Sequence, residues 1–295
     1  MSSINNTEEV TAHSDALFPY AYNILGSVED AKDVVQDVLT KHLAAPPSEG
    51  ITNLKSYLIR SVVNHAINTK NRLKKTLSDG AIWLPEPVAT DDAADRPLQL
   101  REILSYSLLV LMERLSASER AVFILRESFD YSHEEIANVL SISVAHSRKL
   151  FSRAKERLFK PAPMRSKIKE EREQEILDSY ISAIRQRNIS QLEGLMNADI
   201  RYYADGGGKV PLAASLCLGA KAVAELQTMV YHKWLHAMRM VYTRVNHQPA
   251  FLFYRGGRLI ACQVFEMAAE DGHLLQINTV LDPDKLKGFP QEVAE

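Results

Sequence analysis

The sequence has few of the residues that build disulfides, metal sites or membrane spans. Its 295 residues include two cysteines, and Cys217 and Cys262 each lie among apolar neighbours, which predicts small core residues rather than a disulfide or metal ligands. No apolar run approaches the length of a membrane span, and the first residues, MSSINNTEEV, lack the basic and apolar regions of a secretion signal. We therefore expect a cytoplasmic protein with no membrane partner, no metal site and no cofactor.

The chain also has little net charge, −2 at pH 7, which argues against nucleic-acid binding by bulk charge. Its positive charge is local instead. Residues 51–75 contain six basic residues and no acidic one, and residues 144–165 contain seven basic residues and one acidic residue. Two local basic surfaces of this kind suit the phosphate backbone of a nucleic acid.

Residues 131–158 predict a helix-turn-helix. Ser132 and Glu135 have the spacing of a capping box, and residues 141–143 are too few for anything but a turn. The second helix combines an apolar inner face with a basic outer face, as in helices that enter the major groove of DNA. An ordinary helical hairpin with a solvated basic face is the alternative. The residues that we expect to contact DNA from this helix are His146, Arg148, Lys149 and Arg153.

Hydrophobic periodicity divides the rest of the chain into helices followed by strands. Apolar residues at helical spacing cover residues 8–45, 53–75, 98–160 and 169–187, whereas the later runs alternate and contain hairpin signals at Gly256-Gly257 and Asp271-Gly272. Helices followed by an antiparallel meander predict a separate α+β domain. The predicted parts are a helical bundle (8–75), a proline-containing linker (76–99), a helix-turn-helix domain (100–160) and an α+β domain (166–295).

Three segments of the helical part resemble extracytoplasmic-function sigma factors of bacterial RNA polymerase. Residues 25–43, LGSVEDAKDVVQDVLTKHL, resemble the region 2 helix that docks on the polymerase, and residues 57–75, YLIRSVVNHAINTKNRLKK, resemble the helix that opens and reads the −10 element. Residues 115–158 resemble region 4, which reads the −35 element. The resemblance implies two all-α sigma domains, with core RNA polymerase and promoter DNA as partners.

Three short motifs narrow the resemblance to sigma factors with a fused SnoaL-like domain, the SigJ-like subfamily. The chain contains WLPEP in the linker, DGGGK in the α+β domain and DPDKL near its end, where the subfamily pattern has NPDKL. The resemblance implies an α+β cone that regulates the sigma core in cis, with these motifs at the regulatory contact. They are Trp83, Leu84, Pro85, Glu86, Pro87; Asp205, Gly206, Gly207, Gly208, Lys209; and Asp282, Pro283, Asp284, Lys285, Leu286.

The resemblance implies two binding surfaces on region 2, one for polymerase and one for DNA. A polar stripe opposite the apolar face of the first segment is expected to bind polymerase, although a solvated helix face is the simpler alternative. The basic second segment is expected to hold phosphates and to read base edges. The residues are Asp30, Asp33, Gln36 and Asp37 for polymerase, and Arg60, Asn64, Asn68, Lys70 and Arg72 for DNA.

The α+β domain leaves two classes of function open. Some SnoaL-like domains are isomerases or cyclases, and Tyr203, Asp205, His232 and His236 are polar groups near apolar runs that could act as a base. Three successive glycines instead suit close packing against another backbone. We therefore expect a regulatory domain without enzymatic activity, with room for an unidentified small-molecule ligand. The alternatives are an isomerase-type or ligand-binding domain fused to a DNA-binding module, and a repressor that needs no polymerase.

Overall fold

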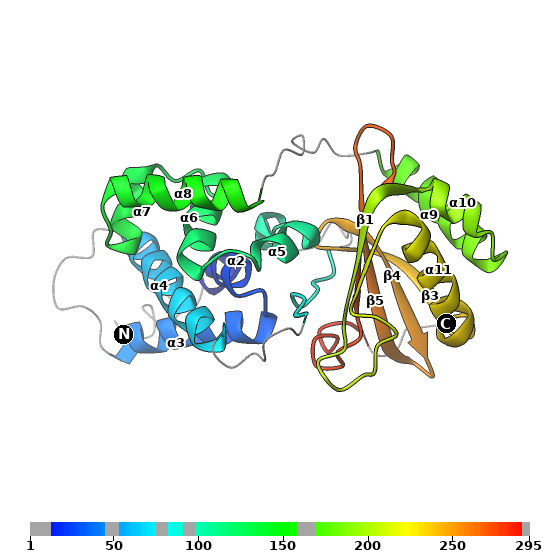
Figure 1. Ribbon diagram of the computed structural model, residues 1–295. Coiled ribbons are helices and arrows are strands. Elements are labelled where there is room, and N and C mark those ends of the chain that lie inside the picture. The colour runs from blue at the N-terminus through cyan, green and yellow to red at the C-terminus, as the bar shows by residue number, and fades with distance from the viewer. Residues whose placement is uncertain (1–12, 45–52, 75–81, 91–97, 159–168, 291–295) are drawn as a thin grey trace. The chain divides into compact units, whose positions relative to one another are not determined.

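The computed structural model describes residues 13–44, 53–74, 82–90, 98–158 and 169–290 (Figure 1). The described residues fall into two compact units. The ranges 1–79, 92–104 and 108–162 form a helical unit, and the ranges 80–91, 105–107 and 163–295 form an α+β unit. The domain limits predicted at residues 8, 75, 76, 160, 166 and 295 lie outside the described residues.

The helical unit begins with three helices that share one core. They are α2 (Ser14–Leu25), α3 (Val28–Ala44) and α4 (Leu54–Lys74), and their apolar faces are buried against one another. A 3₁₀ helix, η1 (Leu98–Glu102), and α5 (Tyr106–Met112) follow. Three further helices complete the unit: α6 (Ala117–Glu127), α7 (His133–Leu140) and α8 (Val144–Leu158).

The predicted helix-turn-helix is confirmed in α7 and α8. The Ser132 side chain accepts a hydrogen bond from the Glu135 amide, and the Glu135 carboxylate accepts one from the Ser132 amide, which completes the capping box. Ser143 caps α8 by accepting from the His146 amide. Between the helices, Ser141 adopts the left-handed conformation (φ 55°, ψ 46°), where helix-turn-helix sequences often have glycine.

The α+β unit is a six-stranded sheet with helices. The helices are α9 (Glu170–Arg185), α10 (Ile189–Gly194), α11 (Ala220–Val230) and the π-helical turn η2 (Tyr231–Leu235). The strands are β1 (Met196–Asp205), β2 (Leu216–Leu218), β3 (Arg239–Val245), β4 (Gln248–Arg255), β5 (Arg258–Met267) and β6 (Leu274–Val280). They lie in the order β2-β1-β6-β5-β4-β3.

The prediction of a purely antiparallel meander is correct for β3 to β6 and wrong for β1. The hairpins at Gly256-Gly257 and Asp271-Gly272 form as predicted, but β1 pairs in parallel with β6. The intervening α10, α11, η2 and β2 were not predicted. Two parallel strands need a long connection between them, so they lie far apart in the sequence. The positions of the strands along the sequence therefore do not show that β1 pairs with β6.

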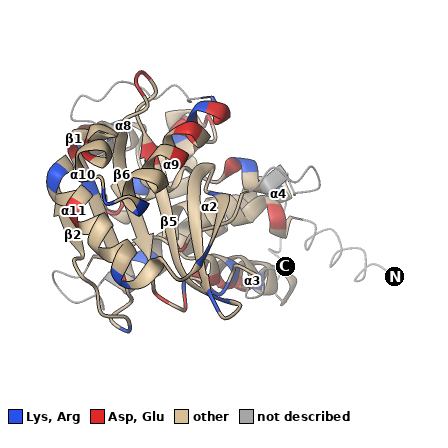
Figure 2. Ribbon diagram, turned by 90° about the vertical axis from the view of Figure 1, so that its right-hand side faces the viewer, with Lys and Arg blue, Asp and Glu red and all other residues tan. Residues whose placement is uncertain are grey.

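The helix α9 is attached to the sheet by its apolar face and also by charged residues. The carboxylate of Glu173 lies 2.8 Å from Nη1 of Arg244 on β3, and both side chains are largely buried. Figure 2 marks the acidic and basic residues along α9. Among the described helices, none is long and apolar enough to span a membrane.

Candidate functional site

The four polar residues predicted to bind polymerase lie together on α3. Asp33, Gln36 and Asp37 are exposed, and with Asp30 they line a hollow that also includes His65, Thr69 and Arg72 of α4. Nε2 of His65 lies 3.5 Å from the Asp37 carboxylate. Burial and the charge of Lys41 lower the pKa of His65 despite Asp37, so the imidazole is mainly neutral at pH 7.

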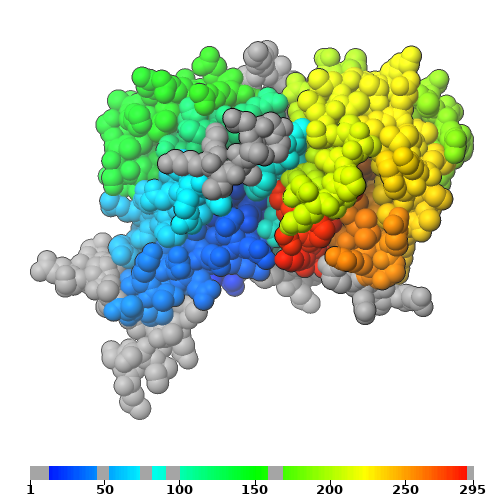
Figure 3. All heavy atoms as spheres, turned by 60° about the horizontal axis from the view of Figure 1, so that its bottom comes forward, coloured from blue at the N-terminus to red at the C-terminus, as the bar shows by residue number. Residues whose placement is uncertain are grey.

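Two residues predicted to read the promoter form hydrogen bonds with the helix-turn-helix. Nη2 of Arg60 donates to Oγ of Ser141 at 2.8 Å, and Nδ2 of Asn64 donates to the carbonyl oxygen of Val139 at 2.7 Å. Figures 1 and 3 show α4, in cyan, beside the green helices α6 to α8. Asn68 and Arg72 remain exposed. The side chain of Asn64 is therefore partly covered by the helix-turn-helix, whereas that of Arg60 is exposed.

A buried ionic cluster lies close to the same packing surface. Nζ of Lys70 donates to both carboxylate oxygens of Glu113 at 2.9 Å and to the carbonyl oxygen of Leu25 at 2.8 Å. Arg120, whose side chain is 0% exposed, donates from Nη1 to Glu113 and from Nε to the carbonyl oxygen of Asn23 at 2.8 Å. The cluster thus ties α2 and α4 to α6 and the turn before it. Whether Lys70 also binds phosphate stays a prediction.

The two cations of this cluster stabilise the ionised form of Glu113. Burial acts to raise the pKa of its carboxyl group, but the charges of Arg120 and Lys70 outweigh burial and hold the pKa below its ordinary value. Removing the carboxylate would leave two buried cations without their counter-ion. We expect such a change to be among the most disruptive in the helical unit.

The recognition helix α8 presents the basic face that its sequence predicts. His146, Arg148, Lys149 and Arg153 are all exposed, whereas Ser147, Leu150, Ala154 and Leu158 are buried. Arg148 lies 3.5 Å from Glu134, and both side chains are more than 60% exposed, with values of 65% and 62%. A pair this exposed holds Arg148 weakly, so Arg148 can exchange its partner for a base or phosphate at little cost.

The WLPEP segment belongs to the α+β unit, where the DGGGK and DPDKL motifs hold it. The Asp205 carboxylate accepts a hydrogen bond from the Leu84 amide at 2.8 Å and lies 2.6 Å from Nζ of Lys285. The same Nζ donates to the Leu84 carbonyl oxygen and lies 4.2 Å from the centre of the Trp83 ring. We call these contacts of Trp83 and Leu84 with Asp205 and Lys285 the clasp.

A second set of contacts holds the rest of this segment. The Tyr106 hydroxyl donates to the Pro85 carbonyl oxygen at 2.6 Å. The Val88 amide donates to Oδ1 of Asn246 at 2.9 Å, and Ala89 pairs with Val245 as an isolated antiparallel bridge. Residues 82–90, which are part of the predicted linker, are therefore fixed to the α+β unit at two places. The remaining predicted linker residues 76–81 and 91–97 lie outside the described residues.

Lys209 joins two of the motifs rather than contacting the linker. Its ammonium forms an ion pair with Asp284 and lies 3.4 Å from Asp282. Hydrogen bonds from Lys209 and Lys287 lower the pKa of Asp284 to about 2. Asp282, at the position where the subfamily pattern has asparagine, also accepts from the Asp284 amide at 3.1 Å.

The glycines of the DGGGK motif are needed for close approach at two positions. A Cβ on Gly207 would lie 2.3 Å from Cγ of Asp282, and its φ of +61° disfavours any side chain. A Cβ on Gly206 would lie 2.3 Å from the carbonyl oxygen of Val210. A Cβ on Gly208, in contrast, would meet no atom within 4 Å. These approaches explain two of the three glycines by packing.

Sequence reasoning missed the residues that join separate segments. Glu113 and Arg120 read as ordinary charged helix residues, and Asn246 as part of a strand. Their partners lie 43, 97 and 158 residues away for the contacts Lys70–Glu113, Arg120–Asn23 and Val88–Asn246. No local spacing reports such pairings.

Comparisons with known proteins agree with the two helical segments. The family Sigma-70 region 2 matches residues 10–76, and the family Sigma-70, region 4 matches residues 105–158. The two matches include the segments whose sequences resemble region 2 and region 4.

Full-length similarity extends the agreement to the α+β unit. The chain is 25% identical over 297 residues to the ECF RNA polymerase sigma factor SigJ of Mycobacterium tuberculosis, covering 96% of this chain and 93% of that protein. It is 26% identical over 301 residues to the ECF RNA polymerase sigma factor SigG of the same organism, covering 89% and 79%. The crystal structure of the M. tuberculosis extracytoplasmic function sigma factor SigJ superposes with a TM-score of 0.74 at 24% identity, covering 97% and 99%.

The order of regions 2 and 4, the α+β unit that follows them and the full-length similarity confirm the resemblance. The chain thus carries sigma-70 regions 2 and 4 and resembles extracytoplasmic-function sigma factors over its full length, and it acts in transcription initiation with core RNA polymerase and promoter DNA as partners.

Proposed function

We propose that this sigma factor is held in a resting form by contacts within its own chain, and that its SnoaL-like domain sets how readily it leaves that form. The observation that carries the proposal is the clasp. Residues 82–90 lie in the covalent connection between region 2 and region 4, and Asp205 and Lys285 hold Leu84 of this segment against the SnoaL-like domain. The domain therefore acts on the segment whose freedom determines how far the two sigma regions can separate.

Separation matters because the two regions read two different promoter elements. In the resting form, Arg60 and Asn64 are engaged by the end of α7 and the following turn, and the ionic cluster of Lys70, Glu113 and Arg120 reinforces that packing. A two-state element of this kind responds to any ligand that prefers one state. Core polymerase and promoter DNA are the ligands that favour the separated state.

The residues proposed to act in the separated state are those on exposed faces. Asp30, Asp33, Gln36 and Asp37 would bind polymerase, and Asn68 and Arg72 would join Arg60 and Asn64 at the −10 element. His146, Arg148, Lys149 and Arg153 would contact the −35 element from α8. The proposed place of action is the cytoplasm, where RNA polymerase works.

We also propose that the SnoaL-like domain is regulatory rather than catalytic. One largely apolar cavity of this domain is lined by 17 residues, and none of these is Asp, Glu or His. Of the candidate bases, Asp205 is bound by Leu84 and Lys285, His232 contacts the Ile184 carbonyl oxygen at 2.9 Å, and neither His236 nor Tyr203 lines the cavity. A general base must lie within hydrogen-bond reach of its substrate.

Transcription with purified core polymerase on fragmented genomic DNA tests the proposal. Wild-type protein should direct specific transcripts, and D205N, which weakens the clasp, should direct more of the same transcripts at limiting protein. D199N, a change at an exposed position in the same strand, is the matched control. Absence of specific transcripts from all three folded proteins would contradict the function, and equal yields from wild-type protein and D205N would contradict the regulation.

A further inference from the structure

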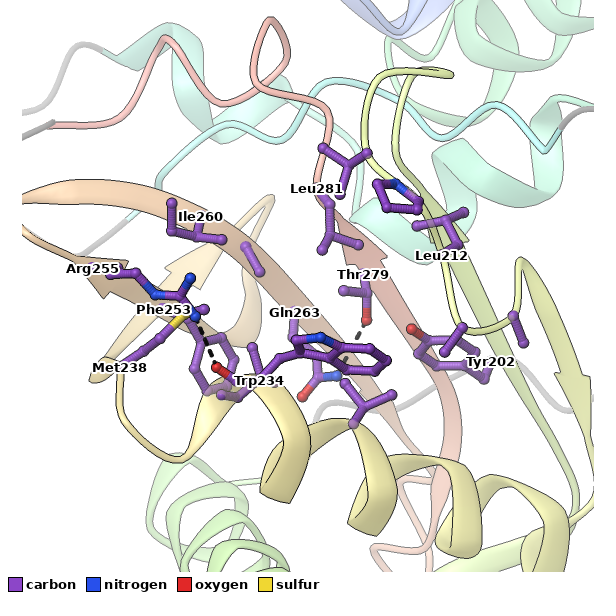
Figure 4. Close-up of a pocket in the computed structure, with 17 residues that line it drawn as sticks. Tyr202, Leu212, Trp234, Met238, Phe253, Arg255, Ile260, Gln263, Thr279 and Leu281 are labelled. Carbon is purple, nitrogen blue, oxygen red and sulfur yellow. Dashed lines mark hydrogen bonds between the residues drawn. The ribbon is translucent and has the colours of Figure 1, made fainter.

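One largely apolar cavity of the SnoaL-like domain is large enough for a small molecule. It encloses about 250 Å³ and is bounded by the sheet, by η2 and by the loop of residues 210–214 (Figure 4). Its walls are mostly apolar and include Trp234, Met238 and Phe253. An apolar cavity of ~150 Å³ holds benzene, so this one would hold a ligand of roughly ten non-hydrogen atoms.

One end of the cavity is polar and incompletely hydrogen-bonded. Gln263, only 3% exposed, donates from Nε2 to Gln227 at 2.9 Å and to Thr279 at 3.2 Å. Gln263 and Thr279 both line the cavity. Nε2 of Gln227, beside Gln263, has no hydrogen-bond partner among the described residues, so this end of the cavity is suited to a ligand that carries a polar group. The Tyr202 hydroxyl lines the same end and stays protonated, because burial raises its pKa.

The other polar feature is a single cation at the rim. Arg255 is the one charged residue among the 17 lining residues, and its Nη2 donates to the Trp234 carbonyl oxygen at 3.1 Å. A guanidinium here accepts a neutral or anionic ligand and opposes a cationic one. The cavity thus fits a mostly apolar molecule that carries a hydroxyl, a carboxylate or a similar polar group and no positive charge.

The cavity wall is continuous with both motifs of the clasp. Residues 210–214 directly follow the DGGGK motif, and a Cβ on Gly206 would lie 3.2 Å from Cδ2 of the lining residue Leu212. Leu281, which also lines the cavity, directly precedes the DPDKL motif, and its amide donates to the Asp205 carbonyl oxygen at 2.8 Å. Asp205 therefore contacts a cavity residue through its backbone and the linker through its carboxylate.

From this continuity we infer that the cavity is an effector site, and that a neutral or anionic apolar ligand of about ten heavy atoms stabilises the clasp. The inference rests on the proposed cis regulation. A ligand between the sheet and residues 210–214 adds contacts to both segments that carry the clasp, so it binds the clasped state more tightly than the released one. Its effect on transcription is repression.

The probes are 1-octanol, octanoate and octylammonium, which share one apolar chain and differ in the head group. Calorimetric titration of the full chain should show saturable binding of octanol and octanoate, with octylammonium weaker by up to about fivefold, as expected for an exposed charge. R255Q should remove the difference between octanoate and octylammonium. No saturable binding of any probe would overturn the site.

Hydrogen exchange of the Leu84 and Val88 amides tests the coupling. At ten times the dissociation constant, octanol should slow exchange of the Leu84 amide by about tenfold if it binds only the clasped state. In D205N the probe should still bind but should no longer protect Leu84. A214F, which fills the cavity, should abolish the response, and Q263L should weaken octanol binding should A214F fail to fold.

The outcomes separate the inference from the proposed function. Binding without any change in Leu84 exchange would overturn the coupling. A different result would contradict only the proposed cis regulation. In that case octanol binds and protects the Leu84 amide, but neither octanol nor D205N changes the yield of transcripts.

Discussion

The Asp205 carboxylate accepts a hydrogen bond from the backbone amide of Leu84 at 2.8 Å, across 121 residues of sequence. Leu84 is 0% exposed and Asp205 is 4% exposed, so the bond is shielded from water. Lys285 supplies the counter-charge 2.6 Å away. The described part of the connection between the two sigma regions, residues 82–90, thus belongs to the α+β unit.

Removing the charge of Asp205 should destabilise the SnoaL-like domain. In D205N the largely buried Lys285 loses its counter-ion, and breaking a buried ion pair from one side costs about 3–5 kcal/mol. Denaturant unfolding should show a loss of this order, and limited proteolysis should cut within residues 82–90 more readily. The exposed substitution D199N should change unfolding by less than about 0.5 kcal/mol. Equal stability of the two variants would mean that the clasp contributes little.

The glycines of the DGGGK motif should differ in their tolerance of alanine. G207A places a Cβ 2.3 Å from Cγ of Asp282, whereas G208A meets nothing within 4 Å. Both glycines have positive φ, at +61° and +70°, so each substitution pays about 1–2 kcal/mol for the left-handed conformation. G207A should cost more than G208A, as measured by thermal unfolding. The reverse order would show that the approach to Asp282 is not the reason for Gly207.

Acid should weaken the packing of region 2 against region 4 through Glu113. The pKa of its carboxyl group is lower in the folded chain than the unfolded value of about 4.3. Its stabilising contribution is therefore complete above that unfolded value and is lost as the pH falls through the folded one. The difference in unfolding free energy between wild-type protein and E113Q should shrink below pH 4. E156Q, a change at an exposed position of α8, is the matched control.

Two residues of α8 should differ in how they affect promoter choice. R148A should relax preference at one base pair of the −35 element and cost about 1–3 kcal/mol, because arginine contacts to guanine are specific. R153A should weaken all promoters alike and lower the slope of log affinity against log salt by about 0.9. Competition among promoter variants, with holoenzyme at several salt concentrations, measures both. Unchanged promoter choice in R148A would remove its base-reading role.

Charge reversal on α3 should weaken the complex with core polymerase. D33K changes an exposed residue that is predicted to dock and that forms no ion pair with any residue that the structure describes, so folding should be unaffected. Fluorescence titration against core polymerase should show at least about a tenfold loss of affinity, since like-charge contacts at an interface cost several kcal/mol. D15K on α2 serves as the matched control. Equal affinity of D33K and wild-type protein would leave the acidic stripe as a solvated helix face.

Local sequence signals predicted the helical unit well because the signals for its helices lie within a few neighbouring residues. The capping box of Ser132 and Glu135 and the apolar face of α8 need only neighbouring residues, and both are confirmed. The motifs likewise predicted that Asp205 and Leu84 are brought together. The parallel pairing of β1 with β6 and the cluster of Lys70, Glu113 and Arg120 depend on residues far apart in sequence. Periodicity carries no information about such partners.

The distance between region 2 and region 4 tests the account most directly. Spin labels on cysteines introduced at Ser56 of α4 and Ser152 of α8, both exposed, with Cys217 and Cys262 replaced by serine, would report it by double electron–electron resonance. The account predicts one short distance in the free chain and a longer one with core polymerase. It also predicts that E113Q shifts part of the free chain toward the longer distance. An identical short distance in the polymerase complex would contradict the proposal that the packed form is a resting state.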